Sequence, residues 1–173
     1  MILNTETWDL ENKPLATLFN QFQKALAEEN EKDMVLLFAA EGLINERFDG
    51  GDVSPLEYAV NESSAKMVEL LLDLGANVDK GFRPPIAVAI QRNKFETLKV
   101  LLQKGARTTY HGDNHSYLNS CDSIECFRVL IDHIYAHNQQ SEHNMITVAN
   151  NMCRRNSQEF LEMVIEKTDD EAV

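Results

Sequence analysis

The chain has 173 residues, 43% of them hydrophobic, and a formal net charge of −12. This hydrophobic content is enough for one domain with a core and argues against wholesale disorder, while the acidic balance argues against direct binding of DNA or RNA. No apolar run approaches the roughly eighteen residues that a membrane span requires, and the N-terminus lacks the pattern of a secretory signal, so we expect a cytoplasmic protein.

The charge is concentrated at the two ends of the chain. Residues 1–60 carry 12 acidic and 4 basic residues, residues 61–156 carry 10 and 11, and residues 157–173 carry 6 and 1. The acidic ends would attract a basic protein, although acidic residues also serve solubility alone.

The cysteines give no sign of a disulfide framework. Cys121, Cys126 and Cys153 are odd in number and include no Cys-x-x-Cys pair. We therefore expect reduced, partly buried thiols.

The first predicted element begins at Asn12, a candidate N-cap, with Pro14 in the first helical turn. The length of the segment 12–29 indicates an extended first helix. The segment 25–45 then has the apolar pattern of a second helix, and this pattern ends at Gly42. This helix pair is the first of several related units.

The middle of the chain contains one sequence motif twice. VELLLDLGANVDKG at residues 68–81 is matched by LKVLLQKGARTTYHG at residues 98–112, and SPLEYAV at residues 54–60 is matched by PPIAVAI at residues 84–90. Every match has the same offset of thirty residues. Self-similarity at a fixed period is the signature of a repeat architecture.

Each copy predicts two helices. A proline opens the first helix, and a small residue, Ala59 or Ala89, allows the next helix to pack closely. The second helix has apolar residues with i, i+3, i+4 spacing and ends at Gly75 or Gly105, as expected for a glycine just past a helix end.

The same apolar spacing recurs downstream in two segments, 123–134 and 157–167, at Phe127, Leu130, Ile131, Leu161, Val164 and Ile165. These copies lack the Gly-Ala and Pro-Leu pairs. Terminal repeats often depart from the repeat pattern, because one of their faces is exposed to water.

The motif Pro-Leu-x-x-Ala followed by Val-x-x-Leu-Leu-x-x-Gly-Ala resembles the ankyrin repeat over residues 54–81 and 84–107. The resemblance implies an all-α fold, an ankyrin-repeat solenoid of about five stacked helix-turn-helix units with short β-turn or hairpin links. We expect a single domain, 1–173, with repeats at about 12–45, 46–78, 79–108, 109–138 and 139–168 and a frayed tail at 169–173.

The two copies depart from the family pattern in three ways. Ser54 and Pro84 stand where the consensus has Thr, and Glu57 and Ala87 stand where it has His. The offset of thirty is about three residues short of the family period, which predicts a shortened hairpin before Pro85.

The resemblance implies that the concave surface, built from first helices and hairpin tips, binds another protein, while the repeated leucines form the core. Each link between repeats has one aromatic residue, which is either an interface anchor or a ring folded back on its own repeat. The alternative to partner binding is burial in the core for Val88. For Arg92 it is a solvated surface charge without a binding role. The candidate partner-binding residues are Phe48, Tyr58, Asn61, Phe82, Val88, Gln91, Arg92 and Tyr110.

No catalytic motif is recognisable, because the chain has no Gly-x-Ser-x-Gly, phosphate loop or dinucleotide-binding glycine pattern. His111, Asp113, His115 and Cys121 lie close in sequence, and His133 and His137 are four residues apart, but neither set has an established metal-ligand spacing. We expect no enzyme activity, no metal and no cofactor.

The hypothesis that follows is a non-catalytic protein–protein interaction module, monomeric when free, that acts by occupying a partner's surface. A sharper form is a small acidic bacterial inhibitor or immunity protein that neutralises a basic toxin or enzyme, since acidic inhibitors are steered toward basic targets. The alternatives are a general ankyrin scaffold or adaptor and a metal-dependent enzyme that uses the histidine- and cysteine-rich segment 110–137.

Overall fold

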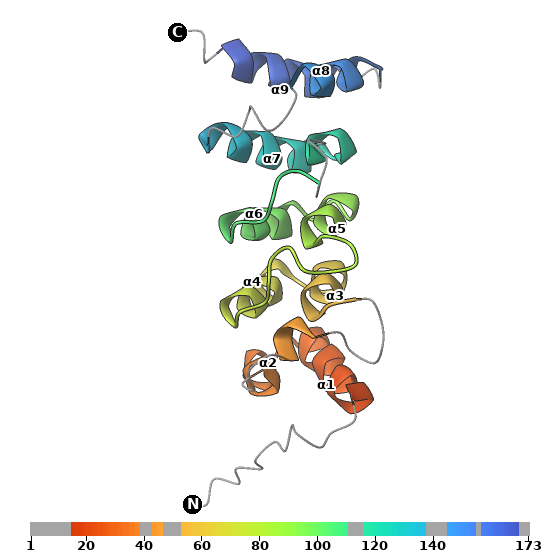
Figure 1. Ribbon diagram of the computed structural model, residues 1–173, viewed down its shortest axis with the longest axis vertical. Coiled ribbons are helices and arrows are strands. Elements are labelled where there is room, and N and C mark those ends of the chain that lie inside the picture. Colours follow the sequence, from red (N-terminus) through yellow and green to blue (C-terminus); the bar gives the residue numbers. More distant parts are fainter. Residues whose placement is uncertain are drawn as a thin grey trace, which may run out of the picture. The chain divides into compact units, whose positions relative to one another are not determined.

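The computed structural model describes residues 15–38, 43–46, 53–110, 116–137, 145–154 and 157–169, and the regular elements within these ranges are all helical (Figure 1). The all-α fold class expected from the sequence is therefore confirmed. The chain divides into two compact units, unit 1 at Met1–Pro84 and unit 2 at Pro85–Val173. The repeat boundaries stay a prediction.

The described part of unit 1 contains two consecutive helix pairs. Its elements are α1 (Leu15–Ala27), α2 (Glu31–Phe38), the short 3-10 helix η2 (Leu43–Asn45), α3 (Pro55–Glu62) and α4 (Ala65–Asp73). Phe22 of α1 is fully buried, and its ring centroid lies 5.7 Å from that of Phe38 and 5.8 Å from that of Tyr58. Helices α1, α2 and α3 therefore share one core.

The α3–α4 pair is delimited by the residues that the repeat pattern singled out. Ser54 caps α3, because its Oγ accepts the N–H of Glu57 at 3.1 Å, and Pro55 occupies the first turn. Past the end of α4, Gly75 has a φ of 98°, and the N–H of Ala76 donates to the carbonyl of Leu71 at 2.9 Å. This is a Schellman motif, in which the left-handed residue is normally glycine.

One asparagine joins the two helix pairs of unit 1. Asn45, at the end of η2, donates from Nδ2 to the carbonyl of Gly75 at 3.0 Å and accepts the N–H of Asn77 at 2.7 Å. Because both contacts are to backbone past α4, the asparagine fixes the register between one link and the next.

Unit 2 continues the series of helix pairs. Its elements are α5 (Pro85–Gln91), α6 (Phe95–Gln103), the 3-10 helix η3 (Tyr117–Ser120), α7 (Ile124–Ala136), α8 (Met145–Arg154) and α9 (Gln158–Asp169). Past α6, Gly105 repeats the geometry of Gly75, with a φ of 86°.

The described parts of the links between repeats differ in structure. Residues 76–84, where a shortened hairpin is predicted, contain turns and no β-bridge. The link after α6 has one antiparallel bridge, between Thr109 and Ser116. This link leads into η3, which is a single short turn of helix. The preceding repeats have a full first helix at this place, and the segment of η3 lacks the Pro-Leu-x-x-Ala motif.

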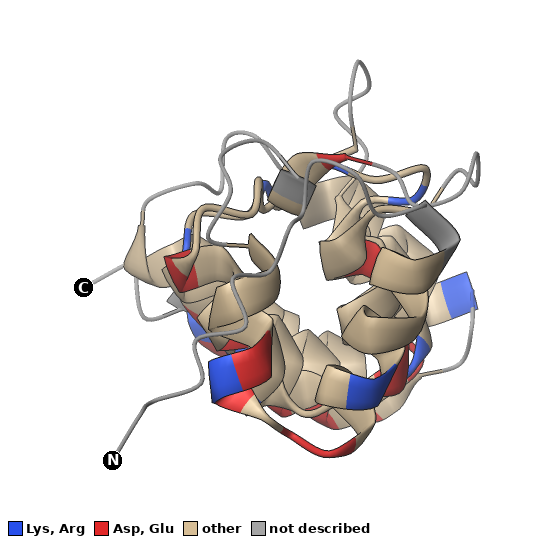
Figure 2. Cartoon of the chain, turned by 90° about the horizontal axis from the view of Figure 1, so that it is seen from below, with Lys and Arg blue, Asp and Glu red and all other residues tan. Residues whose placement is uncertain are grey.

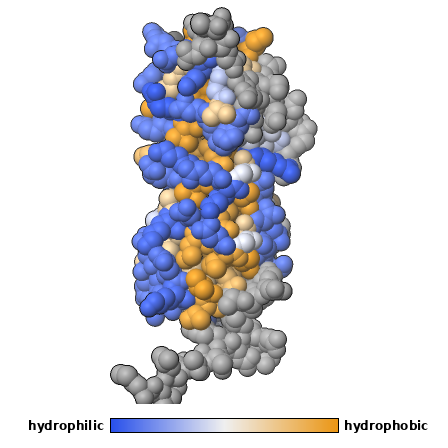
Figure 3. Space-filling view, turned by 90° about the vertical axis from the view of Figure 1, so that its left-hand side faces the viewer, coloured by the Kyte–Doolittle hydropathy of each residue, from blue (hydrophilic) through white to orange (hydrophobic). Residues whose placement is uncertain are grey.

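The surface mixes apolar and polar side chains. Figure 3 shows one side of the molecule, on which hydrophobic side chains lie between hydrophilic ones. Val35 and Leu36 of α2 are exposed by 42% and 44%, and Ile146 of α8 by 76%. None of the described helices is long and apolar enough to cross a membrane.

Candidate binding surface

The predicted site residues of unit 1 have different environments. Tyr58 is half-buried, its ring lies edge-on to Phe19 at 5.3 Å, and its hydroxyl accepts a hydrogen bond from Nε2 of Gln23 at 2.8 Å. Asn61 is half-buried and donates from Nδ2 to the carboxylate of Glu62. Tyr58 therefore packs α3 against α1, whatever else it contacts.

Phe82 is the aromatic residue that lies free of its repeat, because its side chain is 68% exposed, the largest exposure among the aromatic residues of the described ranges. Phe48, the equivalent candidate in the preceding link, lies outside the described residues.

The predicted site residues of unit 2 also differ in their exposure. Val88 is 1% exposed and so lies in the core, the alternative environment considered for it. Gln91 and Arg92, at the end of α5, are exposed. Tyr110 is 37% exposed, but its ring centroid lies 4.1 Å from that of Tyr117 and its hydroxyl is hydrogen-bonded to Oγ of Ser120 at 3.0 Å. Tyr110 is thus largely held against its own unit.

The backbone around Phe82 is held by a buried carboxylate. Glu57 of α3 is 1% exposed, and its Oε2 accepts the N–H of Phe82 at 2.9 Å. Its Oε1 lies 3.4 Å from Nε of Arg83, whose side chain is 48% exposed. One carboxylate therefore contacts two successive residues of the link.

Two further contacts hold the same segment, residues 80–83, which we call the tip segment. Ser54 donates from Oγ to the carbonyl of Lys80 at 2.9 Å while it caps α3. A Cβ on Gly81 would lie 2.6 Å from the carbonyl oxygen of Arg83 and 2.8 Å from Oε2 of Glu57, so only glycine fits there. The tip segment is anchored by its backbone, while the Phe82 ring points away from the core.

The role of Glu57 was not predicted from the sequence, in which the residue stands out only as a departure from the consensus histidine. An acidic residue directly after the buried Leu56 is nevertheless itself a signal. Acidic side chains are almost never fully buried unless they are paired, so a carboxylate at a core position predicts backbone or cationic partners.

A basic run within the acidic chain also escaped the sequence analysis. Residues 80–107 contain one acidic residue, Glu96, and seven basic residues: Lys80, Arg83, Arg92, Lys94, Lys99, Lys104 and Arg107. Averaging over residues 61–156 concealed this run. Figure 2 marks the basic residues in blue and the acidic residues in red on the described part of the chain.

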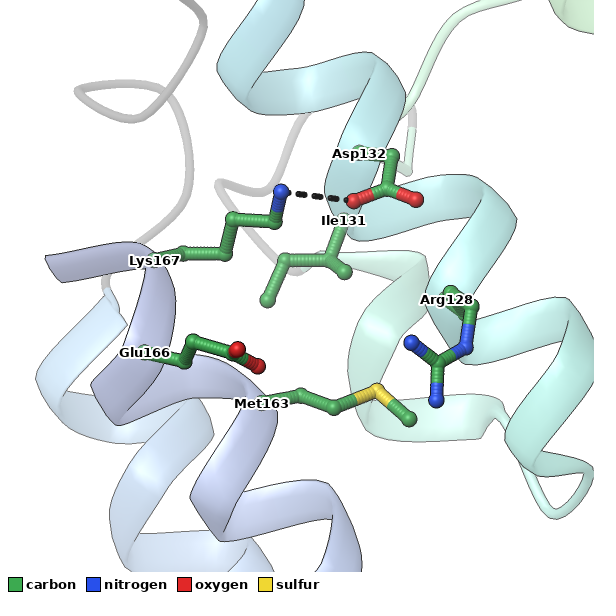
Figure 4. A pocket seen from close by; sticks show the side chains of 6 residues that line it. All are labelled: Arg128, Ile131, Asp132, Met163, Glu166 and Lys167. Atoms are coloured by element: carbon green, nitrogen blue, oxygen red, sulfur yellow. Dashed lines mark ion pairs between the residues drawn. The ribbon is translucent and has the colours of Figure 1, made fainter. Parts of the chain in front are cut away.

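A small cavity of about 230 Å³ lies between α7 and α9 in unit 2 (Figure 4). Ile131 and Met163 supply its apolar wall, and Nζ of Lys167 is paired with Oδ1 of Asp132 at 2.9 Å. Arg128 and Glu166 complete the lining, so the two cations balance the two anions. The cavity shows no preference for either sign of charge.

Of the candidate metal ligands, Cys121, His133 and His137 lie within the described residues. His133 and His137 stack at a centroid distance of 4.1 Å, and Nδ1 of His137 lies 2.9 Å from the carbonyl oxygen of His133. Burial and the neighbouring His137 lower the pKa of His133. Among the described residues no three His, Cys, Asp or Glu side chains are grouped to hold a metal, and the segment with His111, Asp113 and His115 lies outside them.

The comparisons with known proteins agree with the repeat pattern. The family model of the ankyrin repeat matches residues 52–81, which cover α3, α4 and the start of the tip segment. The ankyrin resemblance inferred from the sequence is thereby confirmed for the first copy, residues 54–81, and an ankyrin repeat indicates a protein–protein interaction module. A search of the curated proteins finds no match to the chain.

Proposed function

We propose that this ankyrin repeat chain is a non-catalytic binding protein that acts by occupying the surface of a partner protein, with Phe82 as its principal anchor. The observation that supports the proposal most directly is the exposed Phe82 ring, 68% accessible, on a backbone that Glu57 and Ser54 hold in place. An aromatic side chain on a rigid support loses little conformational freedom when it binds, which is the property of an interface hot spot.

The other exposed candidates, each within its own unit, would add smaller contributions to binding. Gln91 and Arg92 offer polar contacts, and Asn61 and Tyr110 offer a smaller exposed surface. Tyr58 packs against Phe19, and Val88 is buried, so neither offers a large exposed surface. We therefore expect the binding energy to be unevenly divided, with Phe82 the costliest residue to truncate.

Site-specific photo-crosslinking tests the proposal. The full chain is made with benzoylphenylalanine at position 82 or, as a matched control, at position 95, because Phe95 of α6 is also an exposed aromatic at 37%. Irradiation in the native lysate should join one partner to the position-82 protein and should leave the position-95 protein uncrosslinked. Equal crosslinking at both positions, or none at either, would contradict the proposal.

A finer form of the proposal is a cytoplasmic inhibitor or immunity protein directed at a basic toxin or enzyme. It is supported by the net charge of −12 and by the acidic ends, which would steer a basic partner. The association rate with the captured partner should then fall at least about tenfold between low and high salt. An association rate that does not change with salt would contradict the inhibitor proposal and favour the scaffold or adaptor alternative.

The metal-dependent alternative has a separate test. Its motivation is the set of histidines and cysteines in residues 110–137. Elemental analysis of protein purified without chelator should find no stoichiometric metal if the chain is a binding protein only. One equivalent of zinc or another transition metal would revive the enzyme alternative.

A further inference from the structure

We infer that the tip segment recognises an acidic protein surface, in which an apolar pocket for the Phe82 ring is bordered by carboxylates. The inference rests on the proposed function, because it names the chemistry of the partner that the same residues bind. It differs from the basic partner that the acidic ends suggest, since net charge acts over long distances and the contact itself depends on local charge.

Both charged residues within the tip segment are basic, with Asp79 directly before the segment and Glu57 paired with Arg83. Lys80 and Arg83 flank Phe82, and no acidic residue occurs between Lys80 and Arg92. The tip segment also begins the run of residues 80–107 in which seven basic residues accompany a single acidic one. In a chain with a net charge of −12, this is a local reversal of sign.

The ion pair at the tip is oriented with its cation outward. The Glu57 side chain is 2% exposed and the Arg83 side chain 48% exposed, so the carboxylate lies beneath the surface and the guanidinium at it. Lys80 is held through its carbonyl by Ser54 and leaves its side chain exposed. A partner that approaches Phe82 therefore meets the Arg83 guanidinium before the Glu57 carboxylate. Lys80 adds a second exposed cation, and Asp79, which precedes it in the sequence, is half-buried.

These residue types define the partner's complement. The Phe82 ring requires an apolar pocket, because an exposed aromatic gains by leaving water. A guanidinium prefers the planar carboxylate group, and a lysine ammonium pairs with the same anion as a point charge. An aromatic ring between cations also suits single-stranded RNA, but the net charge of −12 opposes a polyphosphate. An acidic protein patch needs only a few carboxylates around one apolar pocket, so the local cations can pair with it at short range although the net charge of the chain opposes an extended polyanion.

A library of displayed cyclic peptides of random sequence is the probe. The full chain, immobilised, should enrich peptides that combine apolar residues with at least two Asp or Glu residues. The selection is repeated with Phe82→Ser and with Lys80→Glu, both at exposed positions. Lys32→Glu, an exposed lysine of α2 that lies outside the tip segment, makes the same charge change as a control.

The enriched peptides should bind Phe82→Ser and Lys80→Glu about tenfold or more weakly than the wild type, and Lys32→Glu about as well as the wild type. Enrichment of basic or uncharged peptides, no enrichment, or binding that survives Phe82→Ser would overturn the inference. So would tight binding of an oligouridine that Lys80→Glu abolishes. Crosslinking at position 82 with a non-acidic partner surface would leave the proposed function intact and remove only this inference.

Discussion

Removing the Glu57 carboxylate should loosen the tip segment and destabilise unit 1. Glu57→Ala deletes the acceptor of the Phe82 N–H at 2.9 Å and the partner of Arg83 at 3.4 Å. A hydrogen bond to a charged group contributes about 1.5–3 kcal/mol, whereas a pair whose cation is half-exposed adds at most about 1 kcal/mol. The cost of burying the carboxylate in the native protein offsets part of this sum. We expect a loss of about 2 kcal/mol.

Chemical denaturation followed by circular dichroism measures the free energy of unfolding, and hydrogen exchange reads the Phe82 amide itself. Glu69→Ala, at an exposed position of α4, is the control and should change the stability by less than about 0.5 kcal/mol. If Glu57→Ala also cost less than about 0.5 kcal/mol and the Phe82 amide stayed protected from exchange, the carboxylate would not anchor the tip.

Three further predictions concern stability. Leu71→Ala should cost about 2–5 kcal/mol in a denaturation experiment, because Leu71 is fully buried; a loss below about 1 kcal/mol would place it outside the core. Gly75→Ala should cost about 1 kcal/mol by conformational strain alone, because φ is 98° and no atom lies within 4 Å of the added Cβ; an unchanged midpoint would contradict the left-handed geometry. The lowered pKa of His133 means that the unfolded chain binds its proton more readily, so stability is retained above about pH 6.5 and falls below it. His133→Gln should flatten the dependence of the denaturation midpoint between about pH 7.5 and about pH 5.5, and an unaltered slope would refute the assignment.

Much of the fold could be predicted from the sequence because its determinants are local. Ser54 and Pro55 start α3, and Gly75 and Gly105 follow α4 and α6 with positive φ, as the repeated phrase predicts. These features depend on backbone conformations that few residue types adopt, so residue identity specifies them directly.

The candidate site could be predicted only in part because the exposure of a side chain depends on contacts with residues outside its own helix or link motif. Phe82 and Tyr110 occupy similar places in their links, yet Phe82 is 68% exposed, whereas Tyr110 packs against Tyr117. Tyr58 meets the rings of α1, and Val88 is buried. The partners that decide these outcomes lie up to several tens of residues away, beyond the reach of a periodicity argument.

The anchor role of Phe82 is the central claim, and it predicts a separation between binding and stability. The measurement is the affinity of Phe82→Ala for the partner crosslinked at position 82, alongside its free energy of unfolding. The ring is exposed in the free protein, so we predict affinity at least about fivefold weaker, or 1 kcal/mol, with stability within about 0.5 kcal/mol of wild type. Wild-type affinity combined with a large loss of stability would show instead that Phe82 is a packing residue.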